Sequence, residues 1–147
     1  MYIDTSGWNH VYGISDIIDN HDYEQNPAVT HEKYAKMSAE GASVTTNRSN
    51  FAHISRFVSE YGGIRWASAS DPGWGYGNAP ASPEEFVERF RGLTDVLLDC
   101  PAIGGLCYTQ LTDLEQEVNG LYTYDRQAKF DPAVFRAILQ RRSVVEE

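Results

Sequence analysis

The sequence contains few cysteines, and this shortage bounds the kinds of site it can hold. Cys100 and Cys107 are the only two cysteines among 147 residues. Both lie in apolar surroundings, without the close pairing or the neighbouring histidine that metal sites use. We therefore expect no metal site and no other cofactor, but two buried thiols in a protein of the reducing cytoplasm.

Basic residues and long apolar runs are also scarce. The chain has 12 Lys and Arg against 21 Asp and Glu, a formal net charge of -9. Such a charge repels phosphate backbones and anionic membrane surfaces, so nucleic acid and membrane are not expected as partners. No apolar run approaches the ~18 residues that span a bilayer. The N-terminus lacks a basic region followed by an apolar one, so we expect no signal peptide.

Aromatic residues, by contrast, are plentiful. They make up 12% of the chain, with 9 Tyr and 3 Trp, and several lie in glycine-rich segments rather than at helical or strand spacing. Aromatic side chains in loops suggest flat ligands such as sugar rings, although ordinary loop packing explains them equally well.

Short β-prone runs alternate with helical patterns along one domain-sized chain. The expected strands are 2–4, 15–19, 51–60 and 103–109. The expected helices are 27–40, 83–100 and one that begins at 132 and carries Arg136, Arg141 and Arg142 in its C-terminal half; their expected capping residues are Asn26, Ser82 and Asp131. This alternation predicts right-handed crossovers and a parallel sheet, with a polar cluster after each strand on one rim. Because a complete (β/α)8 TIM barrel needs about 250 residues, about four strands predict an α/β half barrel.

Glu60 ends one of these β-prone runs and is followed closely by two glycines. Gly62 and Gly63 let the backbone turn sharply beside the carboxylate. In parallel α/β proteins this rim is where chemistry is done, so Glu60 is a candidate catalytic residue. The alternative is a solvated glutamate at the end of a strand.

Four segments taken together resemble the catalytic domain of glycoside hydrolase family 2, which contains β-galactosidases, β-glucuronidases and β-mannosidases. They are residues 4–8 (DTSGW), 21–25 (HDYEQ), 59–63 (SEYGG) and 108–120 (YTQLTDLEQEVNG). The resemblance covers essentially the whole chain. It implies that these segments follow strands five to eight of the barrel and that Glu60 is the nucleophile of a retaining β-glycosidase acting on a carbohydrate.

The chain also departs from the family pattern. The family's general acid/base is a glutamate preceded by asparagine, and no such pair occurs here. The usual β-sandwich domains are absent, and Tyr108 stands where many members carry tryptophan, which leaves the sugar open. Residues 1–147 are therefore expected to be a fragment of the catalytic domain, and the isolated chain to have little activity, since a general acid is worth ~10² to 10⁴ in rate.

Further site residues are expected near Glu60. His21 and Tyr23 follow their strand, where they can hydrogen-bond a sugar hydroxyl or orient Glu60, or simply pack in the loop. The candidate platforms under a sugar ring are Trp8, Trp66, Trp74 and Tyr108, with core or loop packing as the alternative for each, and the platform is favoured only for Tyr108 and Trp66.

Asp113, Glu115 and Glu117 have no spacing that selects an active-site face, so we expect them to bond local backbone. Two other functions stay open at this point. The chain can be a non-catalytic carbohydrate-binding or interaction remnant of such a barrel, or part of a different barrel hydrolase with a metal site of histidine and carboxylates.

Cutting a closed barrel exposes strand edges and the side chains of its interior. The expected edges are 2–4 and 103–109, and the interior candidates are Ile17, Phe57, Val58 and Leu106. We therefore expect the isolated chain to self-associate through these edges or to be partly molten.

Overall fold

The computed structural model describes residues 2–3, 7–8, 10, 14–39, 45–46, 49–50, 55–67 and 73–146. The larger elements are strands β1 (Ile17–Asp22), β4 (Ser55–Gly62) and β5 (Ile103–Thr109) and helices α1 (Pro27–Ala39), α2 (Pro83–Leu98) and α3 (Pro132–Leu139). The smaller ones are β2 (Thr45–Thr46), β3 (Ser49–Asn50) and a 3-10 turn at Val144–Glu146.

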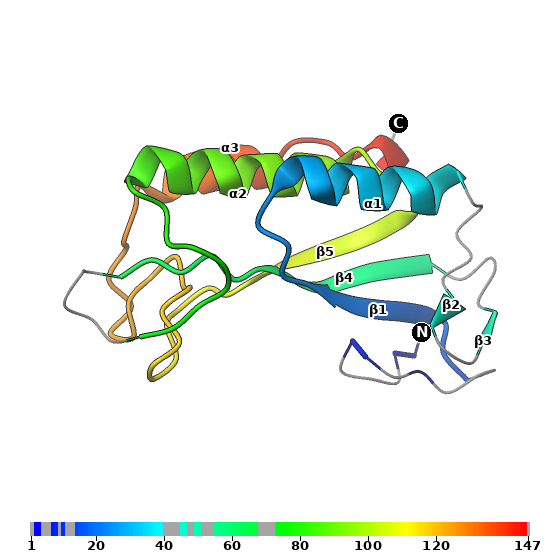
Figure 1. Ribbon diagram of the computed structural model, residues 1–147, viewed down its shortest axis with the longest axis horizontal. Coiled ribbons are helices and arrows are strands. Elements are labelled where there is room, and N and C mark those ends of the chain that lie inside the picture. The colour runs from blue at the N-terminus through cyan, green and yellow to red at the C-terminus, as the bar shows by residue number, and fades with distance from the viewer. Residues whose placement is uncertain are drawn as a thin grey trace.

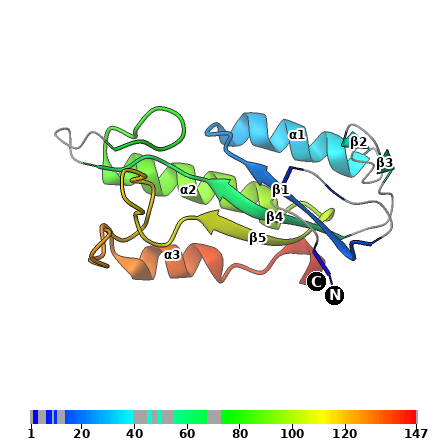
Figure 2. The same cartoon turned by 90° about the horizontal axis from the view of Figure 1, so that it is seen from below.

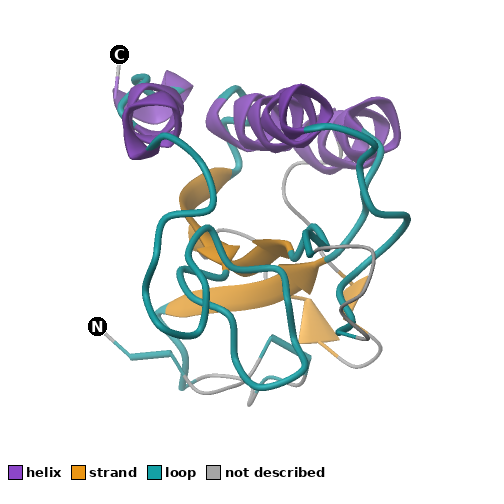
Figure 3. Ribbon diagram, turned by 90° about the vertical axis from the view of Figure 1, so that its left-hand side faces the viewer, coloured by secondary structure: helices purple, strands orange, loops and turns teal. Residues whose placement is uncertain are grey.

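The larger strands form one parallel sheet in the order β1-β4-β5. The three α-helices cover a single face of this sheet, so the described residues form two layers (Figures 1 and 3). The predicted alternation of strand and helix is confirmed, and the arrangement is compatible with a piece of an α/β barrel. The sheet is open over the described residues. No described helix has both the length and the apolar character needed to cross a membrane.

The first predicted strand is wrong over Tyr2 and Ile3, which belong to no strand, while Asp4 lies outside the described residues. The carbonyl oxygen of Tyr2 accepts the backbone N–H groups of Asp16 and Ile17 at 2.9 and 3.3 Å. The segment is thus fastened beside the start of β1 without adding a strand. The described sheet has three strands instead of about four, and its edges are β1 and β5.

Two strands run further than predicted. β1 begins at Ile17 and continues through His21 and Asp22, which we had expected in the following loop. β4 continues through Glu60 to Gly62, while residues 51–54 lie outside the described part. The span expected to be irregular contains β2 and β3, which pair antiparallel.

The helix starts follow the predicted capping residues. Ser82 Oγ accepts the N–H of Glu85 at 3.2 Å, but the Glu85 carboxylate returns to the N–H of Ala81, at 2.7 Å, instead of closing on Ser82. Asp131 Oδ1 accepts the N–H of Ala133 at 2.9 Å and starts α3. Since α3 ends at Leu139, Arg141 and Arg142 lie beyond the helix in which the sequence placed them.

The hydrophobic core lies between the sheet and the helices. Phe90 of α2 is at its centre, with ring centroids 4.8 Å from both Tyr108 and Phe135. Val58 is fully buried in this core and Leu106 packs against it, so neither lines a barrel interior as predicted.

Only one of the two thiols is buried. Cys100 lies in the core, whereas Cys107 is exposed on β5, contrary to the expectation of two buried thiols. Because alternate side chains of a strand point to opposite faces, an apolar setting in the sequence did not by itself identify the covered face.

Candidate active site

The carboxyl ends of β1 and β4 bring three of the predicted site residues together. The two strands are parallel, and a register shift after Asn20 places His21 directly beside Glu60. Tyr23 follows β1 by one residue. Figure 2 shows that the loops after β4 and β5 lie at this same end of the sheet.

These three side chains form a closed set of contacts. The Tyr23 hydroxyl donates to Oε2 of Glu60, and it lies 3.1 Å from Nδ1 of His21. Nε2 of His21 is 3.6 Å from Oε1 of Glu60. Since the single tyrosine proton is directed at the carboxylate, the contact with His21 requires that Nδ1 carry a proton and donate it. The Glu60 side chain keeps 40% of its surface exposed, so a substrate can reach it.

Tyr23 is held in its protonated form. Burial raises the pKa of Tyr23 well above its ordinary value of 10, and the hydrogen bonds with Glu60 and Tyr76 raise that pKa further. The hydroxyl therefore remains a hydrogen-bond donor to Glu60 across the physiological range.

The predicted glycine turn after Glu60 is confirmed. Gly62 and Gly63 have φ values of 81° and 61°, in the left-handed region that favours glycine. A Cβ on Gly62 would lie 2.6 Å from the ring of Tyr108. The carbonyl oxygen of Gly62 accepts a hydrogen bond from Nε2 of Gln25. The turn thus allows close packing directly behind the carboxylate.

Tyr108 and Trp66 are not brought into this cluster. The Tyr108 hydroxyl donates to the Asn119 carbonyl at 3.1 Å and accepts the N–H of Ile64 at 3.3 Å. The Trp66 ring packs 5.4 Å from that of Phe130. Both rings lie against the core, in the packing role that the sequence left as the alternative.

Two aromatic residues outside the predicted site contact the cluster. Tyr76 stacks on Tyr23, with ring centroids 3.6 Å apart and planes 3° from parallel. Trp8 meets His21 edge-on at 5.4 Å. For Tyr76 the sequence showed only an aromatic residue in a glycine-rich loop. Such a residue suggests a flat ligand but does not indicate where the side chain lies in the fold. Trp8 was weighed as a platform but not favoured.

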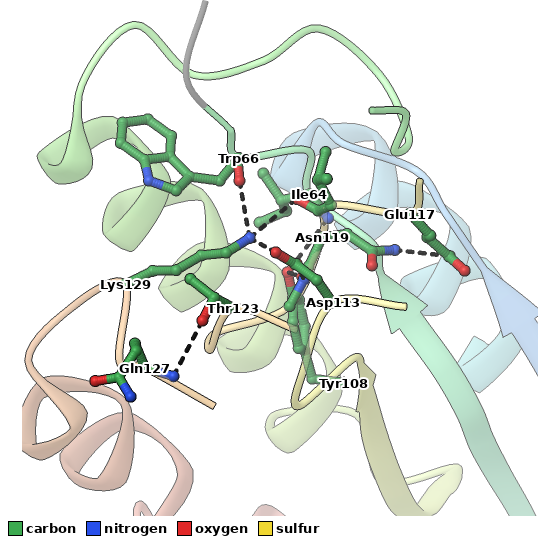
Figure 4. Close-up of polar contacts among 11 residues, drawn as sticks. Ile64, Trp66, Tyr108, Asp113, Glu117, Asn119, Thr123, Gln127 and Lys129 are labelled. Atoms are coloured by element: carbon green, nitrogen blue, oxygen red, sulfur yellow. Dashed lines mark hydrogen bonds and ion pairs between the residues drawn. The ribbon is translucent and has the colours of Figure 1, made fainter. Parts of the chain in front are cut away.

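Asp113 belongs to a buried polar network within the loops that follow β4 and β5 (Figure 4). Its Oδ1 accepts Nζ of Lys129 at 2.6 Å and the N–H of Gly120 at 2.9 Å. Lys129 also donates to the carbonyl of Trp66 at 2.9 Å. The expectation that Asp113 bonds local backbone is confirmed. Over the described ranges, no group of three His, Cys, Asp or Glu is placed to hold a metal ion.

Comparisons with known proteins support the fold. No protein-family model and no curated protein matches the chain. A solved structure of a beta-glucuronidase from Faecalibacterium prausnitzii is similar over 87% of this chain, with a TM-score of 0.56 and 18% identity. The match covers 22% of that protein, so the chain spans about a fifth of its length. At this identity the likeness shows the fold alone.

Four tyrosines are expected to resist ionisation in the folded protein. Burial is the main cause that raises the pKa of Tyr23, Tyr34, Tyr61 and Tyr108. Unfolded tyrosine ionises near pH 10, so these groups contribute stability below about pH 10 that is lost as the pH rises further. A titration of tyrosinate absorbance should show these four ionising together with the loss of native circular dichroism. Ionisation of all nine tyrosines while that signal persists would contradict this prediction.

Proposed function

We propose that this chain carries the nucleophile of a retaining β-glycosidase, β-galactosidase-like or β-glucuronidase-like, and that Glu60 is that nucleophile. The observation that carries the proposal is an accessible carboxylate at the carboxyl end of a parallel strand, held by Tyr23 and faced by His21. The motif resemblance to glycoside hydrolase family 2 and the fold likeness to a beta-glucuronidase support it.

The chemistry assigns a part to each residue. A retaining glycosidase attacks the anomeric carbon with a carboxylate, forms a glycosyl ester and releases the sugar with water. The Tyr23 hydrogen bond fixes the direction of the Glu60 carboxylate. His21, hydrogen-bonded to the same hydroxyl, fixes Tyr23 in turn. The second carboxyl group, about 5 to 5.5 Å away in such enzymes, protonates the leaving oxygen, and we assign it to another part of the barrel.

Covalent labelling tests this proposal. A 2-deoxy-2-fluoro glycosyl fluoride has a leaving group that needs no protonation, so the chain can react with it without the acid. Derivatives of galactose and glucuronic acid should attach to the peptide that carries Glu60, as read by mass spectrometry. Glu60→Gln should abolish the label, and Tyr23→Phe should slow its formation.

Glu24→Gln is the matched control, because this neighbouring carboxylate accepts only local backbone N–H groups in the described contacts and should leave labelling intact. Label on a carboxylate other than Glu60 would refute the assignment. Reversible binding of glycosides without any label would favour the non-catalytic carbohydrate-binding remnant.

A further inference from the structure

The segment Gly73-Trp74-Gly75-Tyr76-Gly77 alternates glycine with aromatic residues, and its backbone conformation determines which side of the segment each residue faces. Trp74 forms an isolated parallel bridge with Glu117, and Tyr76 forms one with Ile64. In extended backbone, successive side chains point to opposite sides. The side chains of Trp74 and Tyr76 therefore share one side, and Gly73 and Gly75 face the other, while Gly77 has a φ of 65° and lies beyond the extended stretch.

Each glycine lies against a neighbouring segment. A Cβ on Gly75 would lie 2.7 Å from Cβ of Arg65 and 2.8 Å from its Cα. Cβ atoms on Gly73 and Gly77 would overlap the side chains of Val118 and Gln25. The glycine side is thus closed by packing, and on the aromatic side Tyr76 is stacked on Tyr23 while Trp74 is exposed.

Trp74 is anchored firmly while its ring stays open to solvent. Its N–H donates to the Gln116 carbonyl at 2.7 Å, and its carbonyl accepts the N–H of Val118 at 2.8 Å. The residue nevertheless keeps 49% of its surface exposed. An exposed aromatic ring on a fixed backbone offers a flat apolar face against which a ligand ring can stack.

The exposed ring is connected to the nucleophile by direct contacts. The centroids of Trp74 and Tyr76 are 5.9 Å apart, with planes at 79°. Tyr76 stacks on Tyr23, whose hydroxyl donates to Glu60. One ring, that of Tyr76, thus lies between Trp74 and Tyr23, the residue that holds the carboxylate.

We propose that Trp74 is a specificity-determining platform that stacks against a second ring of the substrate, next to the sugar attacked by Glu60. The proposal rests on the proposed glycosidase function and adds to it the substrate class. The chain then favours disaccharides and glycosides with a ring-bearing aglycone over glycosides of simple alcohols. The apolar face of a second sugar and an aromatic aglycone offer the same stacking chemistry.

Binding measurements on the full chain test the platform. The probes are methyl β-glycosides of galactose, glucose and glucuronic acid, each paired with its phenyl β-glycoside and with a disaccharide bearing the same sugar. The wild-type chain should bind at least one ring-bearing probe roughly five- to tenfold more tightly than the methyl glycoside of the same sugar, as expected for one aromatic contact. Trp74→Ala should remove this preference and leave the affinity for the methyl glycoside unchanged.

Two further variants sharpen the comparison. Trp74→Phe should retain part of the preference, because a smaller ring still stacks. Tyr124→Ala removes another exposed aromatic, 60% exposed and outside the contacts of the cluster, and should retain all of it. If only the phenyl glycoside binds more tightly than the methyl glycoside, the second ring of the substrate is an aromatic aglycone. If only the disaccharide does, the second ring is a sugar. Both support the platform.

The same preference in wild type and Trp74→Ala would overturn the platform while leaving the assignment of Glu60 intact. The absence of a preference in the wild-type chain would overturn it as well. Failure of the chain to bind any of the glycosides would overturn the platform, and together with the absence of a label on Glu60 it would overturn both proposals. If the wild-type chain shows the ring preference but forms no covalent label on Glu60, only the proposed covalent chemistry would be overturned.

Discussion

Replacing Lys129 with methionine is expected to lower the free energy of unfolding by roughly 3 to 5 kcal/mol, because it leaves a buried carboxylate without its cation. The side chains of Lys129 and Asp113 are only 8% and 10% exposed and lie 2.6 Å apart. Methionine fills a similar volume but supplies no charge, and the carbonyls of Trp66 and Val118 also lose a donor. Since the free energy of unfolding of a domain is about 5 to 15 kcal/mol, this decrease should clearly lower the midpoint of urea unfolding.

Arg141→Met is the matched control. Arg141 bonds Asp95 and Asp99 at 2.9 and 2.8 Å, but its side chain is 38% exposed, so its loss should cost no more than about 1 kcal/mol. Adding Asp113→Asn to Lys129→Met should recover part of the stability, since an amide keeps an acceptor for Gly120 and carries no charge. Equal costs for Lys129→Met and Arg141→Met would show that the buried pair is not the source of stability.

The second large effect concerns assembly. We propose that the isolated chain self-associates through the edges of its sheet, because β1 and β5 each pair on one side only in the described sheet. Within the part of the chain that the structure describes, the three α-helices cover the same face and no helix covers the opposite face of the sheet (Figure 1). Size exclusion coupled to light scattering, under reducing conditions, should give a mass of at least twice the 16.5 kDa of the chain.

Cys107→Lys tests which surface is responsible. Cys107 is exposed on β5, and a charged side chain on an edge strand opposes pairing with another edge. This variant should shift the chain towards the monomer, whereas Tyr124→Lys, a charge placed in a loop outside the sheet, should not. A monodisperse 16.5 kDa wild-type monomer with sharp, cooperative unfolding would contradict the proposal.

The helices were predictable because their signals are local. Ser82 before Pro83, and Asp131 before Pro132, mark starts that the structure reproduces. The strands were less predictable than the helices, because a strand is stabilised by partners distant in sequence. Tyr2 and Ile3 read as a strand but only fasten the start of β1, and His21 reads as a loop residue but pairs within β1.

The candidate site divides in the same way. Glu60, His21 and Tyr23 could be grouped because each follows or ends a parallel strand, and such ends meet on one rim. The stacking of Tyr76 on Tyr23 could not, because it depends on how a loop after β4 folds back over the end of β1. Lys129 was missed for the same reason, since 16 residues separate it from Asp113.

The alternation in residues 73–77 also separates the positions where this protein can change from those where it cannot. Substituting a glycine there would force backbone or neighbouring side chains apart, so those positions have little freedom to drift. Trp74 can be exchanged without disturbing the packing beneath it, because its ring lies outside. With Trp74 as the proposed platform, a single substitution at this loop position would change the substrate preference at little cost to the fold that carries the loop.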